Sequence, residues 1–382
     1  MKAEHRHLRD LVRAWADGRT APLSLPAGVT TEAITDCLRV HNVEAALGSL
    51  LPASAREEAF VQQVNLSRSR SDFLLLEYER LLPILTAPGC QPVLLKGAAL
   101  ALGTYAEPTD RWFLDLDVLV PRPEVDGACE RLEAAGYRHL EGKRDPLFYE
   151  KYHLHRIMLG PQGSVVEIHW DLTIPGSVYK HDVPGVLERA ETCRLGRHEV
   201  ACAAPADQIL HGVYQNIADG FVDLRRILDQ VQLLRRLTPA ERIYLVAEAQ
   251  RTGMARGLWL SLHLVKEVAG YDPGDDLLQP LAPGSATRRT LRGLHVAEGL
   301  LERRAARVEG YTQMLHILLT PTERLRCQEI LRSLWVGEGA LLDRGFRPGQ
   351  LPGPAKRFLI WLRQVKVLGW VSFRMARALA SG

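Results

Sequence analysis

The stretch 111-RWFLDLDVLVP-121 places two aspartates inside a run that otherwise has the apolar pattern of a buried β-strand. Side chains of a strand alternate between two faces, so Asp115 and Asp117 point to the same side, with Cα atoms roughly 6.6 Å apart. Burying two neighbouring carboxylates without a partner is costly, so a cation is expected between them, either Lys or Arg or a divalent metal ion. In the simpler interpretation, the pair lies at a solvated strand end and forms salt bridges with Arg111 or Arg122.

A second strand with the same division of faces follows at 164-SVVEIHWDL-172. Glu167, His169 and Asp171 share one face with Val165, and the residues between them form an apolar face. If this strand lies beside the first one in a sheet, Glu167 joins the two aspartates as a third oxygen ligand. Three carboxylates on neighbouring strands can hold two Mg²⁺ ions for phosphoryl or nucleotidyl transfer. The alternative is an ordinary polar outer face.

A third element, 93-VLLKGAAL-100, has a strand that ends at Lys96 and Gly97 and a helix that begins at once. The N-terminus of a helix offers free backbone N–H groups and the positive end of the helix dipole, and Gly97 allows a phosphate to approach the backbone. Lys96 adds a positive charge for the same phosphates. This turn is therefore a candidate phosphate-binding site.

The distribution of apolar residues divides the chain into three regions. Residues 1–88 are predicted to be mainly helical, residues 89–204 alternate strands and helices with a hairpin turn at 160–163, and residues 205–382 are again predicted to be helical. The expected fold is therefore α+β, with a small α/β domain between a helical N-terminal region and a larger helical C-terminal domain.

Composition limits the range of functions. The 382 residues are 46% hydrophobic and 24% charged, as in ordinary globular proteins, and the net charge of +3 gives no reason to expect a template nucleic acid. The six cysteines have no metal-ligand spacing and are expected to be reduced thiols. The N-terminus lacks the apolar core of a signal peptide, and no apolar run reaches the roughly 20 residues of a membrane span. We expect a cytoplasmic protein.

These motifs, taken in order, resemble a known family. LLKGAAL, then R-x-x-x-DLDVLV, then a helix ending in AAGYR, then EIHW resembles the bacterial uncharacterised nucleotidyltransferases, within the DNA polymerase β-like nucleotidyltransferase superfamily. The resemblance covers about residues 90 to 240 well. It implies a mixed sheet with helices, a nucleoside triphosphate held at the KG turn, and Mg²⁺ or Mn²⁺ bound by Asp115, Asp117 and Glu167 as catalytic residues.

Carried over by position, Lys96, Gly97, Ala98 and Arg111 are the expected nucleotide-binding residues. Gly97 matches the glycine turn of the superfamily, but Ala98 stands where most members have a serine whose hydroxyl contacts the phosphates. Either Lys96 and the backbone then contribute more to phosphate binding, or the phosphates are bound more weakly. Arg111 either contacts phosphate or neutralises the acidic pair.

Three histidines invite a separate interpretation. His153 and His155 lie at strand spacing and suggest zinc, although two such histidines without a further ligand usually belong to a polar surface. His169 is either a proton shuttle or a hydrogen-bonded scaffold, and we favour the scaffold.

The C-terminal stretch 355–382 alternates basic residues with Phe358, Trp361, Trp370 and Phe373. Such a helix can lie on an anionic membrane surface, as a peripheral contact, or pack as the last helix of the domain. We favour packing.

The function indicated is the transfer of a nucleoside monophosphate from an NTP to a small molecule, peptide or protein. Two alternatives stay open. One is a catalytically inactive module that binds nucleotide or another protein. The other is a glycosyltransferase with a DxD motif, which is disfavoured because the KG turn comes only about twenty residues before the DxD.

Overall fold

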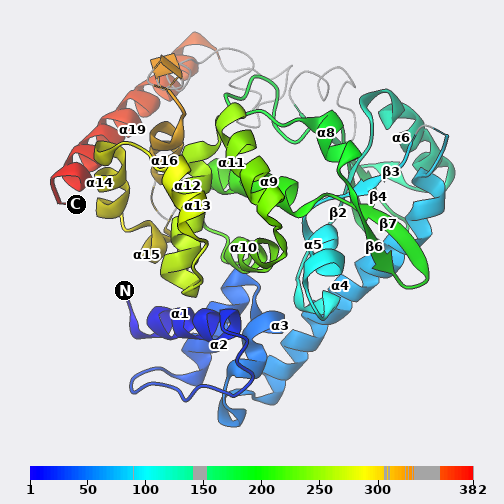
Figure 1. The fold of residues 1–382 in the computed structure, drawn as a ribbon, viewed down its shortest axis with the longest axis horizontal. Helices are drawn as coiled ribbons and strands as arrows, with labels where there is room; N and C mark the ends of the chain where they lie inside the picture. Colours follow the sequence, from blue (N-terminus) through cyan, green and yellow to red (C-terminus); the bar gives the residue numbers. More distant parts are fainter. Residues whose placement is uncertain are drawn as a thin grey trace.

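The computed structural model describes residues 1–88, 90–140, 153–304, 308, 310–322, 324–325, 327–328, 330 and 353–381 (Figure 1). The sheet and the long helix α4 occupy one side of the molecule, and most of the remaining helices form the other side. Residues 146–159 alternate in sequence like the first strand of the predicted hairpin, and residues 146–152 of this segment lie outside the described residues.

The sheet has seven strands in the order β3-β4-β5-β2-β1-β7-β6. The pairs β2–β5 and β1–β7 are parallel, and the other neighbours are antiparallel. The strands are β1 (Val93–Leu94), β2 (Leu116–Leu119), β3 (Arg138–His139), β4 (His155–Leu159), β5 (Val165–His169), β6 (Glu191–Leu195) and β7 (His198–Cys202). The predicted α+β fold with a mixed sheet is confirmed.

Helices precede, interrupt and follow the sheet in the chain. The N-terminal helices are α1 (Ala3–Ala16), α2 (Thr31–His41), α3 (Glu44–Leu47) and α4 (Glu58–Leu85), and the helices between strands are α5 (Lys96–Thr104), α6 (Val125–Ala134) and α8 (Val183–Glu188). After the sheet come α9 (Pro205–Asp219), α10 (Arg225–Arg236), α11 (Pro239–Arg251), α12 (Ala255–Leu264), the π-helical turn η5 (Val265–Ala269), α13 (Asp275–Leu281), α14 (Ser285–Gly293), α15 (Val296–Leu301), α16 (Tyr311–Leu319) and α19 (Pro354–Ser381).

One face of the sheet is apolar and is covered by α4 and α6. Its core includes Leu116, Val118, Val166 and Ile168 from the two central strands. Because side chains alternate along a strand, this packing directs the intervening polar residues of β2 and β5 to the opposite face. The core therefore decides which face carries the carboxylates.

The first three helices share a hydrophobic core with the helices after the sheet, whereas α4 packs on the sheet. Leu8 and Leu11 of α1, for example, belong to the same buried cluster as Leu258 and Leu262 of α12. Every strand that the structure describes lies between Val93 and Cys202. The domain limits at residues 88 and 204 stay a prediction.

Several element boundaries differ from those predicted. The central strand begins only at Leu116, so Asp115 lies just before it. The spacing of apolar residues also predicts helices that open on caps at Thr31 and Ser54, whereas the cap of α2 is Thr30 and α4 begins at Glu58. Strands β6 and β7 were not predicted, because their sequence mixes charged and apolar residues without a strong alternation.

The terminal helix α19 packs against α14 and α16. Val371 and Ala378 are buried, and a Cβ on Gly293 would lie only 2.2 Å from the Ala378 carbonyl oxygen. Phe358 and Phe373 are exposed, so a peripheral membrane contact stays a prediction. Among the helices described, none combines the length and apolar character needed to cross a bilayer.

Candidate functional site

The centre of the site is the parallel pairing of β2 with β5. Asp117 lies directly opposite Glu167 in this register, and both side chains occupy the face of the sheet away from α4. The expectation that these strands are neighbours and bring the two carboxylates together is confirmed. Asp117 is 2% exposed, so its charge must be balanced inside the protein.

Lys96 supplies that balance. Its ammonium group hydrogen-bonds to Asp117 Oδ1 and lies 3.5 Å from Glu167 Oε2. Burial alone would raise the pKa of Asp117, but the charge of Lys96 and the contact with His169 outweigh it and hold the pKa below its usual range. Burial alone would lower the pKa of Lys96, but Asp117 and Glu167 outweigh it and raise the pKa. The predicted phosphate-binding lysine therefore contacts the carboxylates in this structure.

Lys96 reaches this position through an unusual backbone conformation. It is the first residue of α5 and has a φ of +47°, in the left-handed region that a side chain with a Cβ rarely adopts. Such conformations persist where the surrounding structure holds them, and they cluster at functional sites. The turn after β1 thus aims the lysine at the carboxylates.

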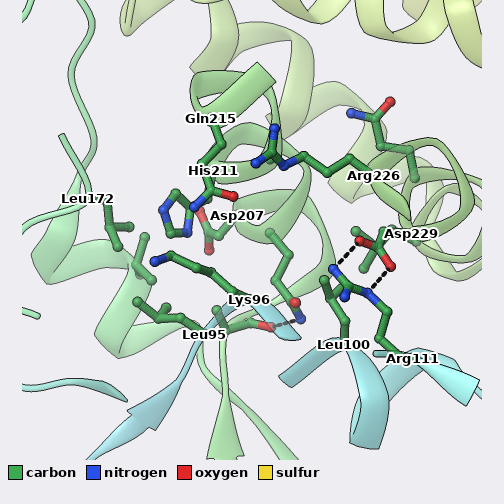
Figure 2. A pocket seen from close by; sticks show the side chains of 16 residues that line it. Leu95, Lys96, Leu100, Arg111, Leu172, Asp207, His211, Gln215, Arg226 and Asp229 are labelled. Carbon is green, nitrogen blue, oxygen red and sulfur yellow. Dashed lines mark hydrogen bonds and ion pairs between the residues drawn. The ribbon is translucent and has the colours of Figure 1, made fainter. Parts of the chain in front are cut away.

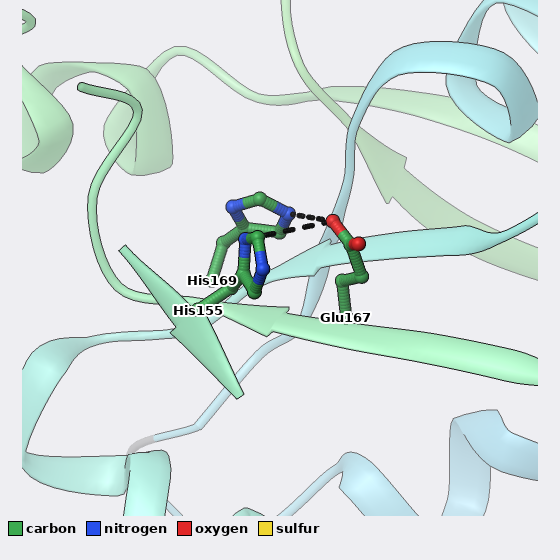
Figure 3. A group of neighbouring side chains, drawn as sticks. All are labelled: His155, Glu167 and His169. Atoms are coloured by element: carbon green, nitrogen blue, oxygen red, sulfur yellow. Dashed lines mark hydrogen bonds and ion pairs between the residues drawn. The ribbon is translucent and has the colours of Figure 1, made fainter. Parts of the chain in front are cut away.

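Two histidines complete the cluster (Figure 3). His169 is fully buried, and its Nε2 lies 2.9 Å from Asp117 Oδ1 and 3.1 Å from Glu167 Oε2. Ionised carboxylates only accept hydrogen bonds, so His169 Nε2 donates to both. The geometry fits the predicted scaffold. His155 of β4 faces His169 across the strand pair, and its Nδ1 lies 3.5 Å from Glu167 Oε2.

Asp115 precedes the first residue of β2 and belongs to the same electrostatic group. Burial, followed by the negative charges of Asp117 and Glu167, raises the pKa of Asp115 to about 6. The positive charges of Lys96 and His169 act in the opposite direction on Asp115 but do not cancel this shift. A divalent ion would favour its ionised form.

Gly97 and Ala98 occupy the first turn of α5. A Cβ on Gly97 would lie 2.4 Å from the Phe113 Cβ, so close packing against the loop before β2 requires glycine here. Ala98 is buried in the core beneath the sheet. Backbone N–H groups in the first turn of a helix lack partners within the helix, so both residues can offer amides to phosphate.

Arg111 is bound elsewhere than at the acidic pair. Its guanidinium forms two hydrogen bonds of 2.7 Å to the carboxylate of Asp229 in α10, and Tyr105 donates a further one of 2.8 Å. Burial would lower the pKa of Arg111, but Asp229 outweighs it and raises the pKa. The predicted neutralisation of Asp115 and Asp117 by Arg111 is not what the geometry shows. The arginine joins α10 to the segment that leads into β2.

A cavity of about 40 Å³ lies between the KG turn and helices α9 and α10 (Figure 2). Lys96, Arg111, Asp207, His211 and Asp229 are among the residues that line it. This volume suits water molecules and not a nucleotide.

Sequence reasoning missed the polar residues that α9 contributes. Asp207, His211 and Gln215 recur every fourth residue and line one side of the cavity. Asp207 and His211 are nevertheless buried, at 3% and 5% exposure. A polar stripe of period four on a helix with apolar neighbours was the signal that could have identified them.

The donor atoms suit a hard divalent ion. Asp115, Asp117 and Glu167 offer carboxylate oxygens, which Mg²⁺ prefers, and burial followed by the charges of Asp117 and Glu167 raises the pKa of Asp115. Lys96 holds part of this charge, so an ion at Asp117 has to displace the ammonium group from it. The residues present therefore fit the metal implied by the resemblance.

Comparison with known proteins agrees with this geometry. The model of the uncharacterised nucleotidyltransferase family matches residues 29–270, well over half of the chain. The chain belongs to this family. In this nucleotidyltransferase family member, the match includes the whole sheet, all predicted site residues and the helices α9 and α10. No curated protein is similar enough to the chain to be matched to it.

Proposed function

We propose that this nucleotidyltransferase family member is a Mg²⁺-dependent enzyme that transfers a nucleoside monophosphate from an NTP to an acceptor. The acceptor is a hydroxyl, amino or phosphate group of a small molecule, peptide or protein. The main support is the register that sets Glu167 opposite Asp117 beside Asp115. Mn²⁺ can replace Mg²⁺ in such an oxygen site.

In the proposed reaction, the acceptor atom forms a bond to the α-phosphorus of the NTP. The bond between the α-phosphorus and the oxygen that bridges it to the β-phosphorus breaks, and pyrophosphate leaves. Bound metal supplies charge stabilisation for the attacking and leaving oxygens. Glu167 is the carboxylate nearest to solvent in the β2–β5 pair and is suited to receive the acceptor proton. His169 holds Glu167 and Asp117 in place, and the first turn of α5 binds phosphate.

The setting proposed for this reaction is the cytoplasm, without a template nucleic acid. The six cysteines lack the spacing of a metal site, and we assign them as reduced thiols in a reducing compartment. The small net charge of +3 supports an acceptor other than a long nucleic acid.

A second candidate is a nucleotide-binding module without turnover. Two observations favour it. Lys96 already neutralises Asp117 without a metal ion, and the buried Ala98 offers no hydroxyl to the phosphates. The two candidates differ in whether pyrophosphate is released.

Thermal unfolding with each of the four NTPs, with and without Mg²⁺, tests the proposal. A ligand at 100 times its Kd stabilises the folded state by about 2.7 kcal/mol. With an unfolding entropy of roughly 2.1 cal/mol/K per residue, this corresponds to a shift of about 3 °C for a chain of 382 residues. We expect this shift with one or more NTPs only when Mg²⁺ is present.

The matched variants are Asp115→Asn and Asp117→Asn, with Asp275→Asn as the control. Asp275 is exposed in the first turn of α13. The Mg²⁺-dependent shift should disappear in the first two variants and persist in the third. No shift with any NTP in the folded wild type would refute both candidates. A shift without pyrophosphate release, across a panel of acceptors, would refute the enzyme and support the binding module.

A further inference from the structure

The sequence offered His153 and His155 for zinc and no further ligand, but the fold places Glu167 and His169 beside His155. His155 Nδ1, Glu167 Oε2 and His169 Nε2 all lie within 4.8 Å of one another (Figure 3). His153, the other histidine considered for zinc, has its ring centroid 6.2 Å from that of His155 and is not part of this group.

The two separations that involve Glu167 match those between ligands of a tetrahedral ion. Zinc binds imidazole nitrogen and carboxylate oxygen at about 2.0–2.2 Å, so two ligands of one ion lie roughly 3.3 Å apart. Glu167 Oε2 lies 3.1 Å from His169 Nε2 and 3.5 Å from His155 Nδ1. Each histidine nitrogen is therefore at the spacing from Glu167 Oε2 that two ligands of one ion require.

The sheet holds these residues in place. Glu167 and His169 are two residues apart on β5 and therefore share a face, and His155 is the register partner of His169 on β4. The ring centroids of His155 and His169 lie 4.8 Å apart in a T-shaped arrangement, and both rings contact the carboxylate of Glu167. A site built on paired strands needs little reorganisation to bind an ion.

One donor atom of the group is unsatisfied. His155 Nδ1 is buried and makes no hydrogen bond, although it lies close to Glu167. A bound ion would give this nitrogen a partner and would replace the hydrogen that His169 Nε2 otherwise donates. Buried polar atoms without a partner are costly, which makes an ion at this point favourable.

We infer that His155, Glu167 and His169 form a binding site for a divalent transition-metal ion of the Zn²⁺ type, separate from the oxygen site for Mg²⁺. Two imidazoles and one carboxylate are the donor set that zinc accepts, whereas Mg²⁺ prefers oxygen alone. Three protein ligands leave a fourth position for water or an acceptor oxygen. Glu167 belongs to both sites, and its two oxygens allow it to bridge them.

The inference does not rest on nucleotidyl transfer, because binding of the ion can be measured without nucleotide. The chelator-treated full chain is titrated with Zn²⁺ by calorimetry and with Co²⁺ by the visible absorption that Co²⁺ shows in nitrogen-containing sites. We expect one ion per chain, and no comparable binding of Mg²⁺ at His155.

The variants are His155→Gln and Glu167→Gln, with His139→Ala as the control. His139 lies on β3 and contacts Glu133, away from the group. Loss of an outer-shell partner alone weakens metal binding roughly 10–100-fold, so loss of a ligand should weaken it by more than about 100-fold. The control should bind as the wild type does.

The inference is overturned if the wild type binds neither Zn²⁺ nor Co²⁺, if His155→Gln binds them normally, or if His139→Ala abolishes binding. Because His155 is partly exposed, its substitution is less disruptive than that of the fully buried His169, and thermal unfolding of the chelated variant verifies the fold. These outcomes are independent of the NTP-dependent shift, so the failure of either proposal can be recognised separately.

Discussion

Replacement of Lys96 by methionine should destabilise the protein in a way that depends on metal and pH. Methionine keeps much of the length and apolar volume of lysine but removes the ammonium group that contacts Asp117 and lies 3.5 Å from Glu167. Without it, two carboxylates that face each other in the sheet lose their cation. Asp117 is almost fully buried and cannot recover its hydration.

The magnitude follows from these distances. At 3.5 Å and an effective dielectric constant of 20, two unit charges attract by about 5 kcal/mol, and the desolvation of the lysine offsets part of this. Removal of one partner from a buried pair costs about 3–5 kcal/mol in comparable cases. For 382 residues the unfolding entropy is about 0.8 kcal/mol/K, so the expected fall in Tm is about 4–6 °C.

The assay is thermal unfolding of Lys96→Met and wild type in a chelating buffer between pH 5 and 8. The difference in Tm between the wild type and Lys96→Met should be largest at high pH. It should shrink as the pH falls, because protonation of one carboxylate removes the repulsion between the carboxylates. Addition of Mg²⁺ should restore part of the loss. Lys266→Met is the control, since Lys266 pairs with Asp272 at the surface, where solvent screens the two charges, and its Tm should stay near that of the wild type.

Two results would refute this reasoning. If Lys96→Met unfolds within about 1 °C of the wild type at pH 8 in chelator, the ammonium group does not balance the carboxylates as the geometry indicates. If Lys96→Met lowers the Tm by the same amount at every pH, the loss of stability comes from packing and not from charge.

Three further outcomes follow from the contacts. Gly97→Ala should destabilise the protein by about 1–3 kcal/mol in urea unfolding, because the new Cβ would collide with Phe113; unchanged stability would contradict that packing. Asp229→Asn should cost about 3–5 kcal/mol by the same measurement, since it leaves Arg111 buried without its anion, and a loss below 1 kcal/mol would argue against the pair. Burial lowers the pKa of His41 to about 4, so the stability it contributes is present above pH 6.5 and is lost as the pH falls toward 4. The loss over that window is about 3 kcal/mol, and a His41→Gln variant that shows the same pH profile would contradict the assignment.

The periodicity of the sequence predicted those parts of the site that depend only on residues close together in the chain. Alternation along 164–172 assigned Glu167 and His169 to one face of a strand, and β5 has that division of faces. The order of strand, KG turn and helix predicted α5, which begins at Lys96. Such patterns are reliable because the strand and helix periods are properties of the backbone itself.

Local sequence patterns did not predict the contacts of three site residues, because each contact joins segments that are well separated in the sequence. Arg111 was expected either to contact phosphate or to neutralise the nearby aspartates, but its partner Asp229 is 118 positions away. Lys96 was assigned to phosphate, but the left-handed turn aims it at Asp117, 21 positions away. Gly97 was explained by phosphate approach, whereas Phe113 packs where its Cβ would be.

The sequence by itself determined which residues could carry the chemistry: carboxylates and histidines on the polar faces of strands, and a lysine at a strand-to-helix turn. Only the tertiary structure decided how they meet. The parallel register of β2 and β5 brings Asp117 to Glu167, and the antiparallel register of β4 and β5 brings His155 to His169 and Glu167. Register follows from how the whole apolar face packs on α4 and α6, and that packing joins segments that are far apart in the chain.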